Sequence, residues 1–414
     1  MIVLVFLLIT STASGATQQV MVSGTENNLP TSSTEYINLI GSMDLTNWST
    51  SESHRVTTWP ANGEITDLRI ELSGSPSTGD SYAFSIRVNE ATPGDALTCT
   101  ISNAETSCND LVNSTTISAG DTVGFEVNPD SSPDARDAYW SVIWNPTTPD
   151  ETVLGGLVHN SLATSGTQYL HLHATSDPET SAWDKSTLFP TNGTLKSLYA
   201  YVDYNPDNGA GVQSRTFTVG GIDCTISEAE KTCNSAADTQ AVVAGEAYNV
   251  VSTASGTPLA TRVYYGIVFV PDTSGQFTFH ATTDDNLPGS ATEYNKFSGG
   301  YWVWSGTEAT FYGLANAFTI KNFYAEVETD PGAATETFDF TLRIDGADQG
   351  LTCQVTGDVH TCNDTADIAV SDGDRLTNKV VPASAPAVGD SRFAWTGYIA
   401  PTGGEVERRV MVVN

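Results

Sequence analysis

The six cysteines of this chain form three identical Cys-x8-Cys pairs, and this spacing constrains the fold more than any other feature of the sequence. The pairs recur at intervals close to the size of an ordinary domain, so the sequence indicates three tandem copies of one module. We expect one disulfide in each pair, pinning one tight hairpin and contributing about 2–3 kcal/mol by loop closure. The alternative is a metal or redox site, although the spacing is wider than in zinc or thioredoxin motifs. The pairs are Cys99 with Cys108, Cys224 with Cys233, and Cys353 with Cys362.

Other landmarks repeat in the same order as the cysteines. The segment TENNLPTSSTEY, which begins at Thr25, returns as TDDNLPGSATEY from Thr283 and more faintly as HNSLATSGTQY from His159. Each module closes with an apolar run that follows a single arginine, and we expect this arginine to pair with a carboxylate of its own module in a structural role. The three arginines are Arg136, Arg262 and Arg392.

Short runs with alternating apolar residues, such as ITDLRIEL from Ile65, are separated by clusters of Gly, Pro, Asn, Asp and Ser. This pattern predicts antiparallel strands with one buried face, and no helical periodicity is sustained. About eight strands in about 130 residues predict an all-β fold of three tandem antiparallel β-sandwich modules with jelly-roll-like topology. The expected boundaries are a signal peptide at 1–16, repeats at 17–149, 150–273 and 274–402, and an extra C-terminal strand at 403–414.

The N-terminal run IVLVFLLI is too short to span a bilayer and is followed by the small residues of STASGA, which suit signal peptidase cleavage after Ala16. No Lys or Arg precedes the run, so a first buried strand is the alternative. With the disulfides, this predicts a secreted or extracellular surface protein without a transmembrane segment; a virion is the alternative location.

The chain carries 17 Lys and Arg against 49 Asp and Glu, a formal net charge of -32. Such a field repels phosphate backbones, so we expect no nucleic-acid partner. Four acceptor sequons fall in expected loops or strand ends and are candidates for glycosylation. They begin at Asn47, Asn113, Asn192 and Asn363.

Candidate ligand-binding residues are few. We expect His171 and His173 to lie on one strand and to face solvent, and a metal shared by the two histidines is the alternative. Acidic residues gather at Asp284, Asp285 and Glu293, and in the first copy at Glu26 and Glu35. Calcium could use such loop oxygens, yet the spacing matches no EF-hand and a solvated acidic loop is the alternative. We expect no cofactor, with calcium as the remaining option.

The sequence favours binding or building over catalysis. It holds no nucleophile motif, P-loop or dinucleotide fingerprint, and three copies without a repeated polar constellation are typical of an array or spacer. Five tryptophans in the first halves of modules could stack on sugars or pack in the cores. They are Trp48, Trp59, Trp183, Trp302 and Trp304.

The third copy, FTLRIDGADQGLTCQVTGDVHTCNDTADIAVSDGDRL, resembles a module of predicted structural and appendage proteins of marine tailed phages and of uncharacterised secreted bacterial proteins. The resemblance covers the second half of each repeat well and the first half loosely. It implies a structural role but no activity, and it transfers no functional residues. A signal peptide departs from the phage pattern, because tailed-phage virion proteins assemble in the cytoplasm.

The C-terminal run RVMVVN echoes QVMVSG, the run from Gln19 that opens the first module. We therefore expect a spare strand with Val406, Val410 and Val412 as assembly residues, which could pair with another subunit and build filaments by strand addition. The alternatives are that this strand completes the third module or that the reading frame is cut short. The expected function is a non-enzymatic subunit of a surface filament, appendage or virion fibre that associates with itself. An adhesin or carbohydrate-binding array, with a glycan or cell-surface ligand as its partner, is the alternative.

Overall fold

The computed structural model describes residues 17–25, 27–40, 48–209, 211–283, 285–301 and 303–401. The predicted signal peptide and the predicted C-terminal strand lie outside these residues. The described part of the chain contains strands and two short 3-10 helices, which confirms the all-β prediction.

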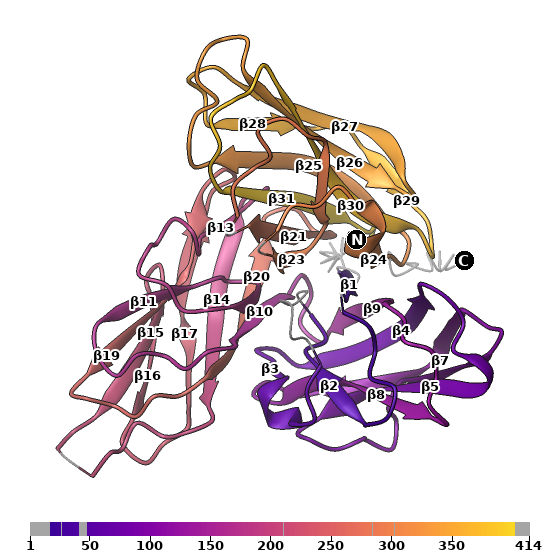
Figure 1. Ribbon diagram of the computed structural model, residues 1–414. Coiled ribbons are helices and arrows are strands. Elements are labelled where there is room, and N and C mark those ends of the chain that lie inside the picture. Colours follow the sequence, from indigo (N-terminus) through magenta and orange to yellow (C-terminus); the bar gives the residue numbers. More distant parts are fainter. Residues whose placement is uncertain are drawn as a thin grey trace, which may run out of the picture.

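The strands fall into three successive groups that correspond to the three repeats (Figure 1). The first group comprises β1 (Gln19–Gly24), β2 (Glu35–Ile37), η1 (Glu52–His54), β3 (Thr57–Thr58), β4 (Gly63–Leu72), β5 (Ser77–Val88), β6 (Thr98–Asn103), β7 (Ser107–Ile117), β8 (Thr122–Asp130) and β9 (Ala138–Pro146). The second comprises β10 (Thr152–Val158), β11 (Thr167–Leu170), β12 (Ala174–Ser176), β13 (Thr187–Leu188), β14 (Gly193–Val202), β15 (Ser214–Val219), β16 (Ile222–Ser227), β17 (Thr232–Val242), β18 (Ala247–Tyr248), β19 (Val250–Ser255) and β20 (Val263–Pro271). The third comprises β21 (Gln276–Thr283), β22 (Glu293–Lys296), β23 (Gly299–Tyr301), η2 (Glu308–Phe311), β24 (Gly313–Leu314), β25 (Phe318–Val327), β26 (Thr337–Ile344), β27 (Ala347–Thr356), β28 (Thr361–Asp364), β29 (Ile368–Val370), β30 (Arg375–Ala383) and β31 (Ser391–Tyr398).

Each group builds two packed sheets with the same strand order. One sheet, here called the contact sheet, runs β1-β9-β4-β7 in the first module, β12-β10-β20-β14-β17 in the second and β23-β21-β31-β25-β28 in the third. The other, the outer sheet, runs β2-β8-β5-β6, β11-β19-β15-β16 and β22-β30-β26-β27. The first and last long strands of a module are thus neighbours in the contact sheet, as in an eight-stranded jelly roll.

Alternation of buried and half-exposed residues explains how each sandwich closes. In β14, every second side chain from Leu198 onward is buried in the core between the two sheets, and the intervening side chains are half-exposed. Three large apolar clusters result, one for each module. The opening strands β1 and β10 depart from this alternation, because all their residues are buried.

The three cysteine pairs form the expected disulfides. The hairpin interpretation was wrong, however. Cys99 lies on β6, which pairs with β5 in the outer sheet, whereas Cys108 lies on β7, which pairs with β4 in the contact sheet. The chain crosses from one sheet to the other at this turn, so the disulfide ties the two sheets together along their shared open edge. The other two disulfides have the same placement.

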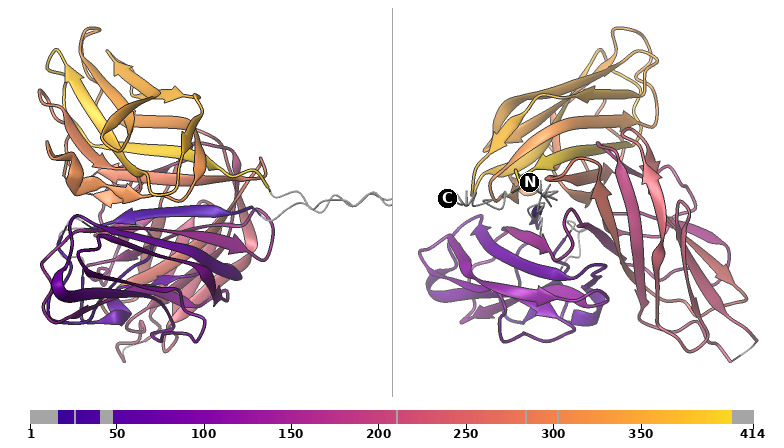
Figure 2. Two further views of the ribbon diagram at one scale, coloured as in Figure 1. Left: turned by 90° about the vertical axis from the view of Figure 1, so that its right-hand side faces the viewer. Right: turned by 180° about the vertical axis from the view of Figure 1, so that it is seen from behind.

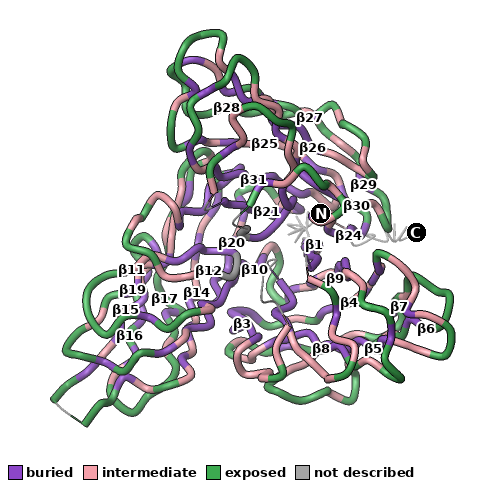
Figure 3. Tube along the Cα trace, in the orientation of Figure 1, coloured by how far each residue is buried: buried purple, intermediate pink, exposed green. Residues whose placement is uncertain are grey.

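The three modules surround a common centre, where β1, β10 and β21 lie (Figure 1). A two-residue strand of each module packs on the contact sheet of the next: β3 contacts β10, β14 and β20, β13 contacts β21 and β31, and β24 contacts β1, β4 and β9. The third contact returns to the first module, so the repeated arrangement closes into a ring. Figure 2 shows this ring from the side and from behind, and Figure 3 shows buried residues around its centre and exposed loops at its periphery.

Candidate functional site: the contacts that close the ring

The contact between the first and second modules depends on glycines in the second. A β-carbon built on Gly266 would clash with the backbone oxygen of Thr58, and one on Gly155 would lie 2.6 Å from Cγ2 of Thr57. The hydroxyl of Thr58 donates a hydrogen bond to the carbonyl oxygen of Tyr264 at 3.1 Å. The backbone of β3 therefore approaches β10 and β20 as closely as the missing side chains allow.

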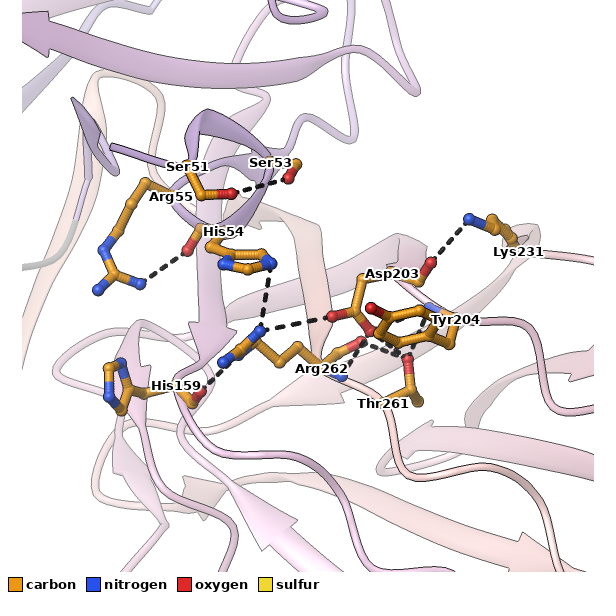
Figure 4. A network of polar contacts seen from close by, with 10 residues as sticks. All are labelled: Ser51, Ser53, His54, Arg55, His159, Asp203, Tyr204, Lys231, Thr261 and Arg262. Atoms are coloured by element: carbon orange, nitrogen blue, oxygen red, sulfur yellow. Dashed lines mark hydrogen bonds and ion pairs between the residues drawn. The ribbon is translucent and has the colours of Figure 1, made fainter. Parts of the chain in front are cut away.

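A polar network borders this contact (Figure 4). Arg262 Nε donates to the carbonyl oxygen of His159 at 2.7 Å, and its Nη1 lies 3.2 Å from Nε2 of His54 in the first module. Because a guanidinium can only donate, Nε2 of His54 accepts and its proton sits on Nδ1. Burial lowers the pKa of His54, and the charge of Arg262 lowers it further. Asp203 lies 3.6 Å from the same guanidinium, inside the second module.

The contact between the second and third modules centres on His280. Its Nδ1 lies 2.7 Å from the carbonyl oxygen of Leu188, which can only accept, so Nδ1 carries the proton and Nε2 accepts from the Thr278 hydroxyl. Its ring also packs edge-on against Phe189 at 5.0 Å between ring centres. Burial lowers the pKa of His280 to about 3, which keeps the imidazole neutral at physiological pH.

A cation over an aromatic ring adds to this second contact. The guanidinium carbon of Arg392 lies 4.7 Å from the centre of the Trp183 ring. The same guanidinium pairs with Glu326 at 2.7 Å within the third module. The cation–π pair of Arg392 and Trp183 is worth about 0.5–2 kcal/mol, depending on how far it is desolvated.

The contact between the third and first modules closes the ring. Tyr139 of the first module donates its hydroxyl to the carbonyl oxygen of Ala309 at 2.9 Å and packs edge-on against Tyr312. The buried Lys296 Nζ donates to the carbonyl oxygen of Gly24 at 3.0 Å. Arg69 reaches across to Asp372 at 2.7 Å.

The opening strands are buried on both faces because they serve two modules at once. On β1, Met21 belongs to the core of the first module, whereas Val20 and Val22 belong to the apolar cluster of the third. On β10, Leu154 belongs to its own core and Val153 to that of the first module. Each of these two strands thereby contributes side chains to two separate cores.

The prediction that His171 and His173 face solvent was wrong. Both are buried: a hydroxyl of the third module lies close to each, Thr282 Oγ1 at 3.1 Å from His171 Nδ1 and Ser298 Oγ at 3.3 Å from His173 Nε2. The two side chains do leave the core of their own module, but a neighbouring module covers them instead of water. Burial lowers the pKa of His173 to about 4.

His173 also borders a small void at the centre of the ring, lined by both apolar and polar side chains. The void has a volume of about 10 Å³, the space of about one water molecule, and is shared by all three modules. Nδ1 of His173 has no hydrogen-bond partner among the described residues. Within that same part of the chain, no group of three or more His, Cys, Asp or Glu residues could hold a metal ion.

The two segments that connect successive modules lie beside Thr17, the first described residue. The hydroxyl of Thr17 donates to the carboxylate of Asp150, which also accepts from the Ser274 hydroxyl at 2.9 Å. The backbone N–H of Gly275 donates to the Thr17 hydroxyl at 3.0 Å. A β-carbon on Gly275 would lie 3.0 Å from Pro401, so both ends of the described chain lie at this junction.

The repeated arginines form the intramodular ion pairs that the sequence predicts. Arg136 pairs with Asp134 at 2.8 Å, and the pairs of Arg262 and Arg392 are those described above. Sequence reasoning missed the additional reach of Arg262 and Arg392 into the preceding module. Arg262 directly precedes β20 and Arg392 lies near the start of β31, and neither position gave a signal of this contact.

The remaining candidates are dispersed. The sequons at Asn113, Asn192 and Asn363 are exposed, and Asn47 lies outside the described residues. Of the acidic residues, Asp285 raises the pKa of half-buried Glu293 by charge repulsion, after burial as the larger cause. Glu35 accepts a hydrogen bond from Ser33, and Glu26 and Asp284 lie outside the described residues.

Most of the tryptophans are packed against other aromatic side chains. Trp59 and Trp304 are buried in cores, and Trp48 packs against Trp140. Trp183 lies under Arg392, and Trp302 lies outside the described residues. None of the four candidate tryptophans that the structure describes is exposed as a platform for a sugar ring.

In the described part of the chain, no helix is long and apolar enough to cross a membrane. The sequence matches no known family model, and no curated protein matches it. The resemblance to phage appendage modules therefore remains a prediction.

Proposed function

We propose that this chain is a non-enzymatic, extracellular structural protein whose three jelly rolls act as one rigid building block of a surface appendage or virion fibre. The observation that carries this proposal is the ring contact, in which the short strand of each module packs on the contact sheet of the next. A contact of this head-to-tail type builds rings when its rotation closes and fibres when it does not. Here it closes after three modules within one chain.

Matched side-chain sizes support one closed particle over exchange of modules between chains. Strand registers place Val22, Gly155 and His280 at equivalent positions of the three opening strands. Thr57 and Gly313 are also equivalent to each other, and each lies on the short strand that faces such a position. Thr57 faces Gly155, whereas Gly313 faces Val22. Pairing Thr57 with Val22 would overcrowd the contact, and pairing Gly313 with Gly155 would leave a gap, so the order of the modules is specified.

Strand addition by residues 403–414 remains a prediction, and the sheet order limits how it can happen. In each contact sheet the last long strand is flanked on both sides: β9 by β1 and β4, β20 by β10 and β14, and β31 by β21 and β25. A strand that imitates an opening strand would therefore have to displace one. Polymerisation by this route requires release of an opening strand such as β1 from a second copy.

The alternative function, an adhesin that stacks sugars on tryptophan, has less support. Of the five candidate tryptophans, the four that the structure describes pack in cores or at module contacts. A carbohydrate ligand would have to use another surface.

Negative-stain electron microscopy of the chain from Thr17, full length and ending at Pro401, tests the proposal. We expect triangular three-lobed particles from both proteins, and longer assemblies, if they form, only from the full-length chain. Strings of three separate beads in both samples would contradict a rigid building block.

A further inference from the structure

The three ring contacts differ at one equivalent position. Arg69, Tyr199 and Tyr324 share the same register in their contact sheets. A glycine turn of the preceding module covers each position. A β-carbon on Gly120 would lie 3.6 Å from the ring of Tyr199, and one on Gly245 would lie 3.8 Å from the ring of Tyr324.

At the third contact the covering glycine has no such neighbour. A β-carbon built on Gly373 would meet no atom within 4 Å. Arg69, which replaces the tyrosine, is drawn aside: its Nε donates to Asn316 Oδ1 at 2.6 Å and its Nη2 to Asp372 at 2.7 Å. The space that a tyrosine ring fills at the other two contacts is therefore open here.

The opening forms a cavity of about 310 Å³ between the first and third modules, within the size range of small-molecule sites. Leu314 contributes apolar surface, and strands β4 and β7 contribute polar side chains. The cavity is lined by Arg69, Ile70, Glu71, Thr106, Ser107, Cys108, Asn109, Leu314 and Gly373.

Several lining groups have unused hydrogen-bonding capacity. The side chains of Thr106, Ser107 and Asn109 make no hydrogen bond to any residue that the structure describes, and neither does Arg69 Nη1. Together with Glu71, they offer donors and acceptors in one wall. Hydroxyl groups of a ligand can both donate and accept, so they match such a mixed set.

The charges around the cavity argue against an ionic ligand. Arg69 is already paired with Asp372, and Arg375 lies 4.0 Å from Glu71. An anion would meet the Glu71 carboxylate, and a cation would meet Arg69. A neutral, polyhydroxylated ligand meets neither penalty.

We propose that this cavity binds one neutral sugar residue, with Arg69, Glu71 and Asn109 hydrogen-bonding its hydroxyls. The site gives the closed ring a ligand-binding capacity beyond its structural role, and it does not depend on that role. Tyr199 and Tyr324 fill the equivalent space at the other two contacts, so among the three contacts the third alone has this site.

Two variants and a matched control test the site. Arg69→Tyr introduces the residue found at the other two contacts and should fill the cavity without opening the ring. Asn109→Ala removes one hydrogen-bonding side chain, and Asn234→Ala removes the equivalent, equally exposed asparagine beside Tyr199. Thermal unfolding of each variant verifies that it folds.

Saturation-transfer NMR and calorimetric titration with glucose, galactose, mannose, fucose and N-acetylglucosamine provide the readout. We expect at least one of these sugars to bind the wild type. Its affinity should fall about fivefold or more in Asn109→Ala, the worth of about one hydrogen bond, and stay unchanged in Asn234→Ala. Binding should be lost in Arg69→Tyr. No binding of any of the five sugars to the wild type, or equal losses in Asn109→Ala and Asn234→Ala, would overturn the proposal, whatever the shape of the particle.

Discussion

The guanidinium of Arg392 in the third module lies over the indole ring of Trp183 in the second, at 4.7 Å. The residues equivalent to Arg392 in the first two modules, Tyr139 and Tyr264, likewise meet the preceding module in the ring. One position thus serves all three contacts with different chemistry. The ring is a repeated geometry with side chains specific to each contact.

Replacing Trp183 should weaken one contact and leave the cores intact. Trp183→Ala is expected to cost about 0.5–2 kcal/mol of unfolding free energy, because it removes a cation–π pair at a half-exposed site. Trp304→Ala, in the core of the third module, should cost about 3–5 kcal/mol. Chemical denaturation measures both, and equal costs would contradict the assignment of Trp183 to a contact.

Substituting the side-chain sizes of one contact into another should reveal an energetic coupling between the two residues that face each other. Gly155→Val places the residue found at the equivalent Val22 position against Thr57, and overpacking should cost about 1–3 kcal/mol. Adding Thr57→Gly reproduces the pairing of Gly313 with Val22 and should recover at least about 1 kcal/mol. A double-mutant cycle from urea unfolding gives this coupling energy. Simple additivity of the two changes would show that β3 and β10 do not meet.

The buried histidines should make the protein sensitive to acid. His173 and His280 have lowered pKa values in the folded chain, about 4 and about 3, so the unfolded chain binds protons first as pH falls below about 6.5. Stability is therefore fully present above about pH 6.5 and falls on acidification by up to about 1.4 kcal/mol per pH unit for each histidine.

His173→Ile tests this acid sensitivity with the residue that occupies the equivalent place in the first module, Ile40. Urea unfolding at pH 7 and pH 5 should show a smaller loss of stability in the variant than in the wild type. An identical loss in both proteins would exclude His173 as a contributor.

Each disulfide should stabilise its module by closing the open edge of the sandwich. Replacing Cys224 and Cys233 with serine should cost about 3 kcal/mol, because the loop they close is short and the chain-entropy term is modest. The equivalent replacement of Cys353 and Cys362 should cost a similar amount, since the loop has the same length. Thermal unfolding under non-reducing conditions measures both, and a cost near zero would contradict the role of the disulfides as ties between sheets.

Period-two alternation was enough to predict the strands, because a side chain's direction in a strand depends on local backbone geometry alone. ITDLRIEL lies within β4 as expected. Alternation identifies which side chains leave their own core, but it does not show what lies beyond. His171 and His173 left their core and met the third module instead of solvent.

The ring itself could not be predicted, because its contacts depend on two-residue strands and on glycines that read as ordinary turns or strand breaks. The clearest signal was the apolar run VLGGLV, which has no polar face although it opens a sandwich. A strand with two apolar faces requires two partners, and here the second partner is the first module. The cavity beside Arg69 could not be predicted either, because its lining combines residues of the first module with Leu314 and Gly373 of the third.

Small-angle X-ray scattering of dilute residues 17–401 tests closure of the ring most directly. A closed arrangement of three touching modules predicts a radius of gyration of about 21–25 Å, whereas a linear string of the same modules predicts about 33 Å. The ring predicts a radius of gyration of about 21–25 Å for the wild type and a larger radius for Gly155→Val. A value near that of the string, unchanged by the substitution, would contradict it.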